Sequence, residues 1–243
     1  MDDGVPAAAR AARGGAEGPL DILALVEEEH GVPVGVLALE EGLAGAYLRR
    51  PRGALILLNG TEAAPRLRFT LAHELGHHVL SHTQSVDTAA DLRRPERPME
   101  VQANRFAAEL LAPAAGVRSW LDARGGVGVG LDEVVALGAT YGLSAPAALF
   151  RLVAAGALPE RARVRRLLDE IEEGAHLDLR HRLGLPAFED GLSRARERMP
   201  RVPPGSALDA FARRELGAER LAAMVRAALD DVRSTMRGLD LAP

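Results

Sequence analysis

The sequence predicts an α+β fold, with a small antiparallel sheet early in the chain and helices after it. Short apolar runs separated by glycines lie between residues 32 and 60, and helical periodicity takes over after Pro65. The 243 residues are 47% hydrophobic, enough for one substantial core. Early strands followed by late helices are typical of an α+β domain with helical additions.

Three segments are expected along the chain. Residues 1–18 are small, polar and Gly-rich without periodicity, which predicts a disordered tail. Residues 19–158 form the predicted main domain, and residues 159–243 form an all-helical C-terminal extension of unknown role. The main domain begins with a short helix over residues 20–26, which Gly31 closes.

Three strands are predicted next, each rich in Val, Leu or Ile. They are VPVGVLAL (32–39), AGAYLRR (44–50) and ALILLNG (54–60). The last ends in Asn59-Gly60, which indicates a turn. Three strands covered by a helix are enough for a small stable sheet.

Two helices and the loop between them follow. One helix covers about residues 65–82, and another starts near Pro98 and stops before Pro113, with residues 83–97 as the loop. Shorter helices are predicted at 113–123, 131–142 and 145–156, and the remainder is helical with breaks at 184–186 and 200–205.

Composition excludes several classes of function. Without cysteine there are no disulfides, thiolate metal sites or cysteine nucleophiles, so a metal must be held by His, carboxylate or backbone oxygen. A net charge of -4 gives no global reason to bind nucleic acid. No run approaches the ~20 apolar residues of a membrane span, and the first residues contain no signal-peptide core. We therefore expect a cytoplasmic protein that binds neither membranes nor nucleic acid directly.

The sequence His73-Glu74-Leu75-Gly76-His77 lies on the first long helix. Two histidines four residues apart face the same way and can hold one zinc ion at about 2.0–2.1 Å. Glu74 is rotated by ~100° from His73, so it can act on a water at the metal without being a ligand. The alternative is a surface helix that merely carries histidines. Gly76 costs helix stability, which a close backbone contact would explain.

A third ligand is needed, and Glu100 on the second long helix is the best candidate. The metzincin pattern would require Gly at position 80 and His at 83, where the chain has Leu80 and Thr83. His82 is one position off and on the wrong side of the helix. Glu100 completes a His2Glu site that leaves a fourth position for water.

Supporting roles follow from proximity to these ligands. Asn104, one turn after Glu100, is placed to accept a hydrogen bond from a ligand imidazole, although it is also interpretable as a helix-surface amide. Possible transition-state stabilisers are His78, Tyr47 and Tyr141. For each of them, the alternative is an ordinary surface or core residue. The remaining histidines show no partner spacing: His30, His176 and His181.

Two segments, RFTLAHELGHHVLSH (68–82) and EVQANRFAAELLAP (100–113), resemble the ImmA/IrrE family of bacterial metallopeptidases. The strand ending in ILLNG and the helical stretch at 131–158 are also similar, so the resemblance covers roughly residues 20–158. It implies a gluzincin-like fold with zinc on His73, His77 and Glu100 and with Glu74 as the catalytic carboxylate.

The resemblance also implies a substrate, namely a helix-turn-helix repressor cleaved at one bond under stress or mobile-element control. Some members carry an N-terminal DNA-binding module, whereas here only a short tail precedes the domain. Any partner that reads DNA is therefore expected to be a separate chain. Residues 159–243 match nothing familiar, and the oligomeric state is unknown.

The predicted activity is zinc-dependent hydrolysis of a peptide bond, with one zinc per chain and manganese as the alternative metal. A catalytically silent binding protein with the zincin fold is the main rival, and the intact Glu74 argues against it. A DNA-binding regulator is a third reading. The stretch 131–156 resembles a helix-turn-helix in outline, but Arg151 is its only basic side chain.

Overall fold

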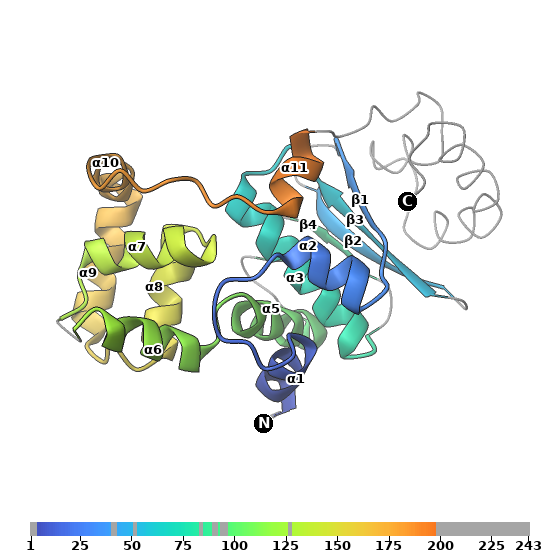
Figure 1. The fold of residues 1–243 in the computed structure, drawn as a ribbon, viewed down its shortest axis with the longest axis horizontal. Coiled ribbons are helices and arrows are strands. Elements are labelled where there is room, and N and C mark those ends of the chain that lie inside the picture. Colours follow the sequence, from blue (N-terminus) through green and yellow to red (C-terminus); the bar gives the residue numbers. More distant parts are fainter. Residues whose placement is uncertain are drawn as a thin grey trace.

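A computed structural model describes residues 4–39, 43–50, 53–82, 85–88, 92, 97–125 and 128–197. A sheet forms one side of the molecule, and helices pack against it and extend away from it (Figure 1). The predicted α+β class is confirmed. The helices expected around residues 65–82, 98–112, 113–123, 131–142 and 145–156 are all present, within a few residues at each end.

The sheet has four strands in the order β1-β3-β2-β4. Their bounds are β1 (Val34–Leu37), β2 (Leu43–Arg50), β3 (Gly53–Asn59) and β4 (Ser85–Thr88). Strands β2 and β3 form a hairpin in which Arg50 pairs with Gly53. β1 then pairs with the free edge of β3 in a parallel direction. The sheet is therefore mixed, and the expectation of a purely antiparallel sheet needs this correction.

The fourth strand, β4, lies where the sequence predicted a loop over residues 83–97. It pairs antiparallel with β2, with a register shift between Leu43 and Gly45. Its four residues, SVDT, are too few to show a period-two pattern, and pairing with β2 rather than local propensity makes them a strand.

Helix α3 (Ala64–Val79) is enclosed between the sheet and helix α5 (Pro98–Leu111). It packs on β2 and β3 on one side and on α5 on the other. Its polar side chains His73, Glu74 and His77 are fully buried, together with Leu71 and Leu75 on its apolar side. The polar side of this amphipathic helix is therefore covered by protein.

Gly76 marks the closest approach between α3 and α5. A methyl group at this position would lie 3.1 Å from Phe106 Cδ1 and 3.2 Å from Ala103 Cα. The close backbone contact inferred from an otherwise costly helical glycine is confirmed.

Residues 4–18 are ordered, contrary to the predicted disordered tail. Helix α1 (Gly4–Ala12) packs on α5 and buries Val5 and Ala9. The guanidinium of Arg13 then donates to the carbonyls of Leu110 and Gly18. Alanine favours helices and allows close packing, but an alanine-rich stretch this short looks like low complexity in the sequence.

The predicted helix over residues 20–26 is present as α2 (Ile22–Ala24), continued by a π-helical turn, Leu25–Glu29. The Asp21 carboxylate accepts hydrogen bonds from the backbone N–H groups of Leu23 and Ala24 and so caps the helix. Gly31 ends the segment with a φ of 63°, as expected for a left-handed helix terminator.

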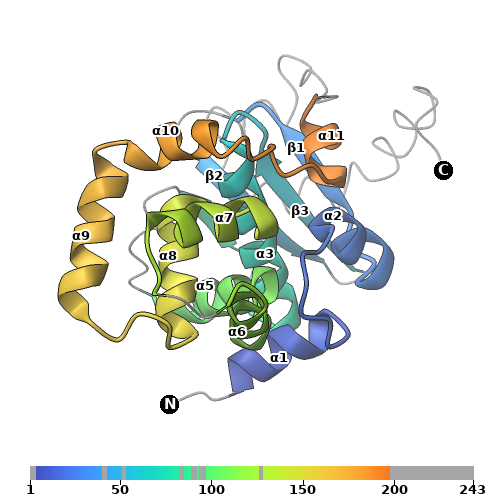
Figure 2. The same cartoon turned by 60° about the vertical axis from the view of Figure 1, so that its left-hand side comes forward.

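Helices α6 to α11 make up the rest of the described chain, with α9 on the outer side of α8 (Figure 2). Their bounds are α6 (Ala114–Ala123), α7 (Leu131–Tyr141), α8 (Ala145–Ala154), α9 (Arg161–Glu172), α10 (Ala175–Arg182) and α11 (Gly191–Glu197). Of the described helices, none is by itself long and apolar enough to cross a membrane. α7 and α8 meet that test only as a pair, which is bent by 102°.

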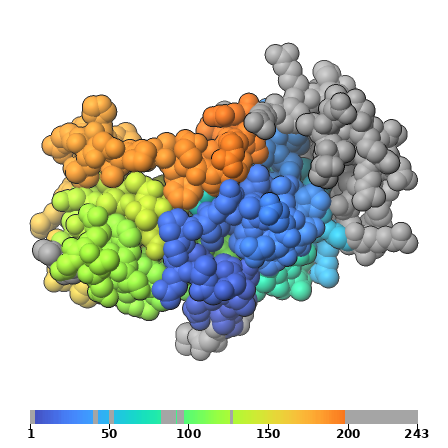
Figure 3. All heavy atoms as spheres, in the orientation of Figure 1, coloured from blue at the N-terminus to red at the C-terminus, as the bar shows by residue number. Residues whose placement is uncertain are grey.

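The expected division after residue 158 is not visible in the core. Leu167 and Ile171 of α9 are buried in the same apolar cluster as the sheet and α3. The chain beyond α10 then runs back across the surface to α11, which lies beside α2 (Figure 3). The part of the predicted extension from residue 198 to 243 lies outside the described residues.

A buried ion pair fastens this returning segment to α3. Arg68 of α3 pairs with Asp190, and both side chains are 3% exposed. The Arg68 guanidinium also lies 4.2 Å from the centre of the Phe188 ring. Burial lowers the pKa of Arg68, and the charge of Asp190 opposes that shift. The α3 helix is thus held from the side of the C-terminal segment as well as by the sheet.

The Asp190→Ala variant should be strongly destabilised, because it leaves the Arg68 charge buried without its carboxylate. Removing one partner of a buried pair costs about 3–5 kcal/mol. The control is Arg194→Ala, which removes a 4.0 Å ion pair with Asp21 that is 62% exposed on the arginine side. We expect that control to cost less than ~1 kcal/mol. Urea unfolding measures both, and equal losses would contradict this role of Asp190.

Candidate metal centre

His73 and His77 of α3 and Glu100 of α5 converge on one point inside the molecule. His73 Nε2 lies 3.1 Å from Glu100 Oε2, and His77 Nε2 lies 3.2 Å from the same oxygen. The two Nε2 atoms are 3.0 Å apart. All three side chains are at most 1% exposed. The three residues chosen from the sequence are therefore brought together.

These positions fit a metal ion. Zinc bonds of about 2.0–2.1 Å in a tetrahedron place neighbouring ligand atoms about 3.3–3.4 Å apart, close to the separations found here. Two imidazoles and one carboxylate are also a ligand set that zinc accepts, and a fourth position remains for water. The structure therefore supports a site that could hold a metal ion at His73, His77 and Glu100.

The carboxylate of Glu100 is kept ionised. Burial alone would raise its pKa, but the hydrogen bonds to His73 and His77 outweigh burial and hold the pKa well below its usual range. Arg97 Nη2 lies 2.8 Å from the other oxygen, Oε1, so that Oε2 is the oxygen that faces the imidazoles. Arg97 was not predicted from the sequence, although it precedes Glu100 at i,i+3 spacing.

Asn104 fixes the orientation of His73, as the sequence predicted. Its Oδ1 lies 2.9 Å from His73 Nδ1, which donates the hydrogen bond. The proton is then on Nδ1, and Nε2 is left with the lone pair that a metal requires. Asn104 is itself held because its Nδ2 donates to the carbonyl of Leu92.

His82 contacts His77 in the equivalent way, and this role was not predicted from the sequence. His82 was rejected as a ligand, and its Nδ1 instead lies 3.0 Å from His77 Nδ1, on the side of that ring away from the cluster. When His77 Nδ1 donates, His82 carries its proton on Nε2, which lies 3.1 Å from Gln102 Oε1. Burial lowers the pKa of His82, which favours this neutral form.

Glu74 lies between α3 and the sheet, opposite Gly45 of β2. A methyl group at Gly45 would come within 2.8 Å of Glu74 Oε1 and 2.7 Å of Thr70 Cγ2. Only glycine leaves room for the carboxylate at this point of the strand. Glu74 is fully buried beside the ligand cluster without being a member of it.

The three proposed transition-state stabilisers are in different places. The Tyr47 hydroxyl lies 3.2 Å from His78 Nδ1, and the Tyr47 ring stacks on the ligand His77 with centroids 6.4 Å apart. These two residues therefore adjoin the site. Tyr141 does not join them, since its hydroxyl donates to the carbonyl of Glu17. That expectation was wrong because an isolated tyrosine carries no sequence signal of its orientation.

Comparison with known proteins agrees with this geometry. The model of the IrrE N-terminal-like domain, which describes a peptidase family, matches residues 27–153. The chain belongs to this family. The match includes both long helices and every residue of the ligand cluster, and it confirms the resemblance noted in the sequence. A search of curated proteins found no match.

Membership of the family makes a peptidase the general class of this protein. The matched region ends at residue 153, shortly before α9, so α9 to α11 lie outside it. Of the ion pair between Arg68 and Asp190, Arg68 lies inside the matched region and Asp190 lies outside it.

The His82→Ala variant should bind metal about 10–100-fold more weakly, because His77 loses the group that fixes its ring and tautomer. His82→Asn should restore part of the affinity, since its side-chain oxygen can accept from His77 Nδ1. His181→Ala, at an exposed histidine on α10, serves as the control. Competition with a chromophoric zinc chelator measures the three affinities. An unchanged affinity in His82→Ala would contradict this role.

Proposed function

We propose that the protein is a zinc-dependent endopeptidase with Glu74 as its catalytic base. The observation that carries this proposal is the convergence of His73, His77 and Glu100 within the peptidase domain, with Glu74 buried beside them. Zinc is favoured by the His2Glu ligand set, and manganese is the alternative. One ion per chain is proposed.

When bound, the metal supplies a Lewis acid that acidifies water and polarises the carbonyl of the scissile bond. Glu74 accepts the proton of the attacking water and passes it to the leaving amine, which balances the hydrolysis. Because Gly45 carries no side chain, the Glu74 carboxylate has room against β2. Tyr47 and His78 are adjoining donors for the oxygen that becomes negative.

The physiological substrate that we propose is a helix-turn-helix repressor, supplied as a separate polypeptide. This follows from the family resemblance alone. The test uses a helix-turn-helix repressor that is encoded beside the gene of this protein. The repressor is incubated with the protein and zinc, and the products are mapped by mass spectrometry. A single cleavage that needs both Glu74 and metal is the expected result, whereas an intact repressor would remove this candidate.

A catalytically silent binding protein is the rival interpretation. The intact Glu74, buried beside the ligand cluster, argues against it.

The Glu74→Gln variant should keep its fold and its metal and lose about 10²–10⁴ in rate, since the amide cannot accept the proton. Peptide hydrolysis and metal content are measured on the same sample. Cleavage at the parent rate would rule out Glu74 as the base.

Each of His73→Ala, His77→Ala and Glu100→Ala should lower the zinc content from one ion per chain, because each removes one of three converging ligands. Elemental analysis after dialysis measures this directly. The control is Glu133→Ala, at a carboxylate that caps α7 through the Gly130 N–H and is remote from the cluster in the chain. Full zinc content together with full activity in Glu100→Ala would contradict the ligand assignment.

A further inference from the structure

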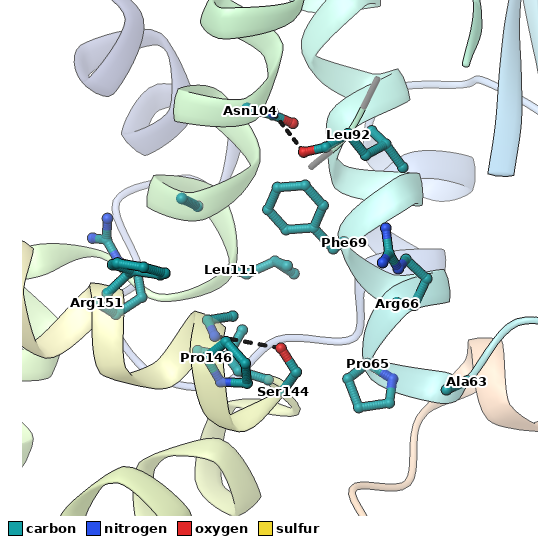
Figure 4. A pocket seen from close by; sticks show the side chains of 14 residues that line it. Ala63, Pro65, Arg66, Phe69, Leu92, Asn104, Leu111, Ser144, Pro146 and Arg151 are labelled. Carbon is teal, nitrogen blue, oxygen red and sulfur yellow. Dashed lines mark hydrogen bonds between the residues drawn. The ribbon is translucent and has the colours of Figure 1, made fainter. Parts of the chain in front are cut away.

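A cavity of about 600 Å³ lies between α3, α5 and the turn that joins α7 to α8 (Figure 4). Its wall is mainly apolar, with Phe69 from α3, Leu111 from α5, and Pro146 and Phe150 from α8. Phe150 is 54% exposed, although it is a large apolar side chain. A volume of this size suits a ligand of several side chains, and the exposed Phe150 ring is available to contact it.

The cavity extends to a residue that contacts the ligand His73. Asn104, which lines one end of it, accepts the hydrogen bond from His73. Phe69 precedes His73 by one helical turn, about 6 Å along the axis of α3. An extended peptide advances about 3.3–3.6 Å per residue. One or two residues of extended peptide therefore cover the distance between the cluster and Phe69.

One charged group at the cavity has no partner among the described residues. Arg66, on the α3 wall, makes no side-chain ion pair or hydrogen bond with any described residue. Arg151, the other cation among the described wall residues, is already bound to Glu109 at 2.7 Å and to the carbonyl of Ala112. Arg66 precedes His73 by about 10 Å along the helix, which corresponds to about three residues of extended peptide.

We propose that this cavity binds the substrate polypeptide next to the cleaved bond. It takes a bulky apolar side chain one or two residues from that bond, and Arg66 pairs with a carboxylate two to four residues from it. The proposal rests on the proposed function and adds a preference in the substrate. The apolar wall selects the bulky side chain, and the Arg66 guanidinium selects the carboxylate. The distances from the cluster set the positions of both in the peptide.

The test uses fluorescein-labelled twelve-residue peptides with a single central Leu or Ala and with Asp or Asn three residues away. Binding is measured by fluorescence anisotropy with the zinc-loaded Glu74→Gln protein, which holds peptide without cleaving it. Cleavage is measured separately as kcat/KM with Glu74 intact. Binding and hydrolysis are thereby separated, and each can fail without the other.

Two variants change the apolar wall. Ala147→Phe fills the cavity from α8, on the wall away from the ligands, and Phe150→Ala removes its exposed aromatic side chain. Leu177→Ala, at an apolar side chain that is 63% exposed on α10, is the matched control. Arg66→Gln removes the free charge, and Arg165→Gln removes an exposed arginine of α9 as its control.

The peptide with Leu should bind about ten- to hundredfold more tightly than the peptide with Ala, as expected for a buried Leu side chain. Ala147→Phe and Phe150→Ala should reduce that ratio, while Leu177→Ala keeps it. Asp should be preferred to Asn by about two- to fivefold, an advantage that Arg66→Gln abolishes and high salt weakens.

The proposal is overturned if Ala147→Phe and Phe150→Ala, folded and loaded with zinc, both keep the preference for Leu. The peptidase function would be unaffected by that result. Tight binding through the cavity without cleavage would instead remove the proposed function and keep the binding site. If Phe150→Ala converts a dimer to a monomer in analytical ultracentrifugation, the cavity belongs to a second copy of the chain and the proposal fails.

Discussion

Helices α3 and α5 come closest at Gly76, where a methyl group would lie within 3.1–3.3 Å of Phe106 and the Ala103 backbone. Glu100 lies three residues before Ala103, and His73 and His77 lie on either side of Gly76. A larger residue at position 76 would push the helices apart and draw the carboxylate away from the imidazoles. The separations of 3.0–3.2 Å within the cluster depend on this one contact. Arg68, held by Asp190, secures the same helix from its other side.

Around this contact, each ligand is fixed by a second group. Asn104 holds His73, His82 holds His77, and Arg97 holds the outer oxygen of Glu100. These contacts restrict rotation of side chains that would otherwise have several rotamers, so less ordering is needed when a metal binds. The whole arrangement is buried, which strengthens its electrostatic interactions. Burial opposes the charge of Glu100, and the neighbouring imidazoles outweigh burial and keep the carboxylate ionised.

The parts of the site that were predicted from sequence follow from helical spacing. His73, Glu74 and His77 share one helix, and Asn104 follows Glu100 by one turn, so a period of 3.6 residues is sufficient to relate them. His82 and Tyr141 were misjudged because a residue beyond a helix end, or in a distant helix, points in a direction that only the tertiary fold determines. Helix α1 and strand β4 were missed for the same reason, since contacts with α5 and β2 stabilise them more than their own patterns indicate.

X-ray absorption at the zinc edge of the zinc-loaded protein tests the ligand set most directly. We predict a four-coordinate ion with nitrogen and oxygen ligands at about 2.0–2.1 Å, and multiple-scattering features of two imidazoles. Loss of one oxygen or nitrogen neighbour in Glu100→Gln, with both imidazole features retained, would identify the third ligand. A six-coordinate ion, or one without two imidazoles, would contradict the site built from His73, His77 and Glu100.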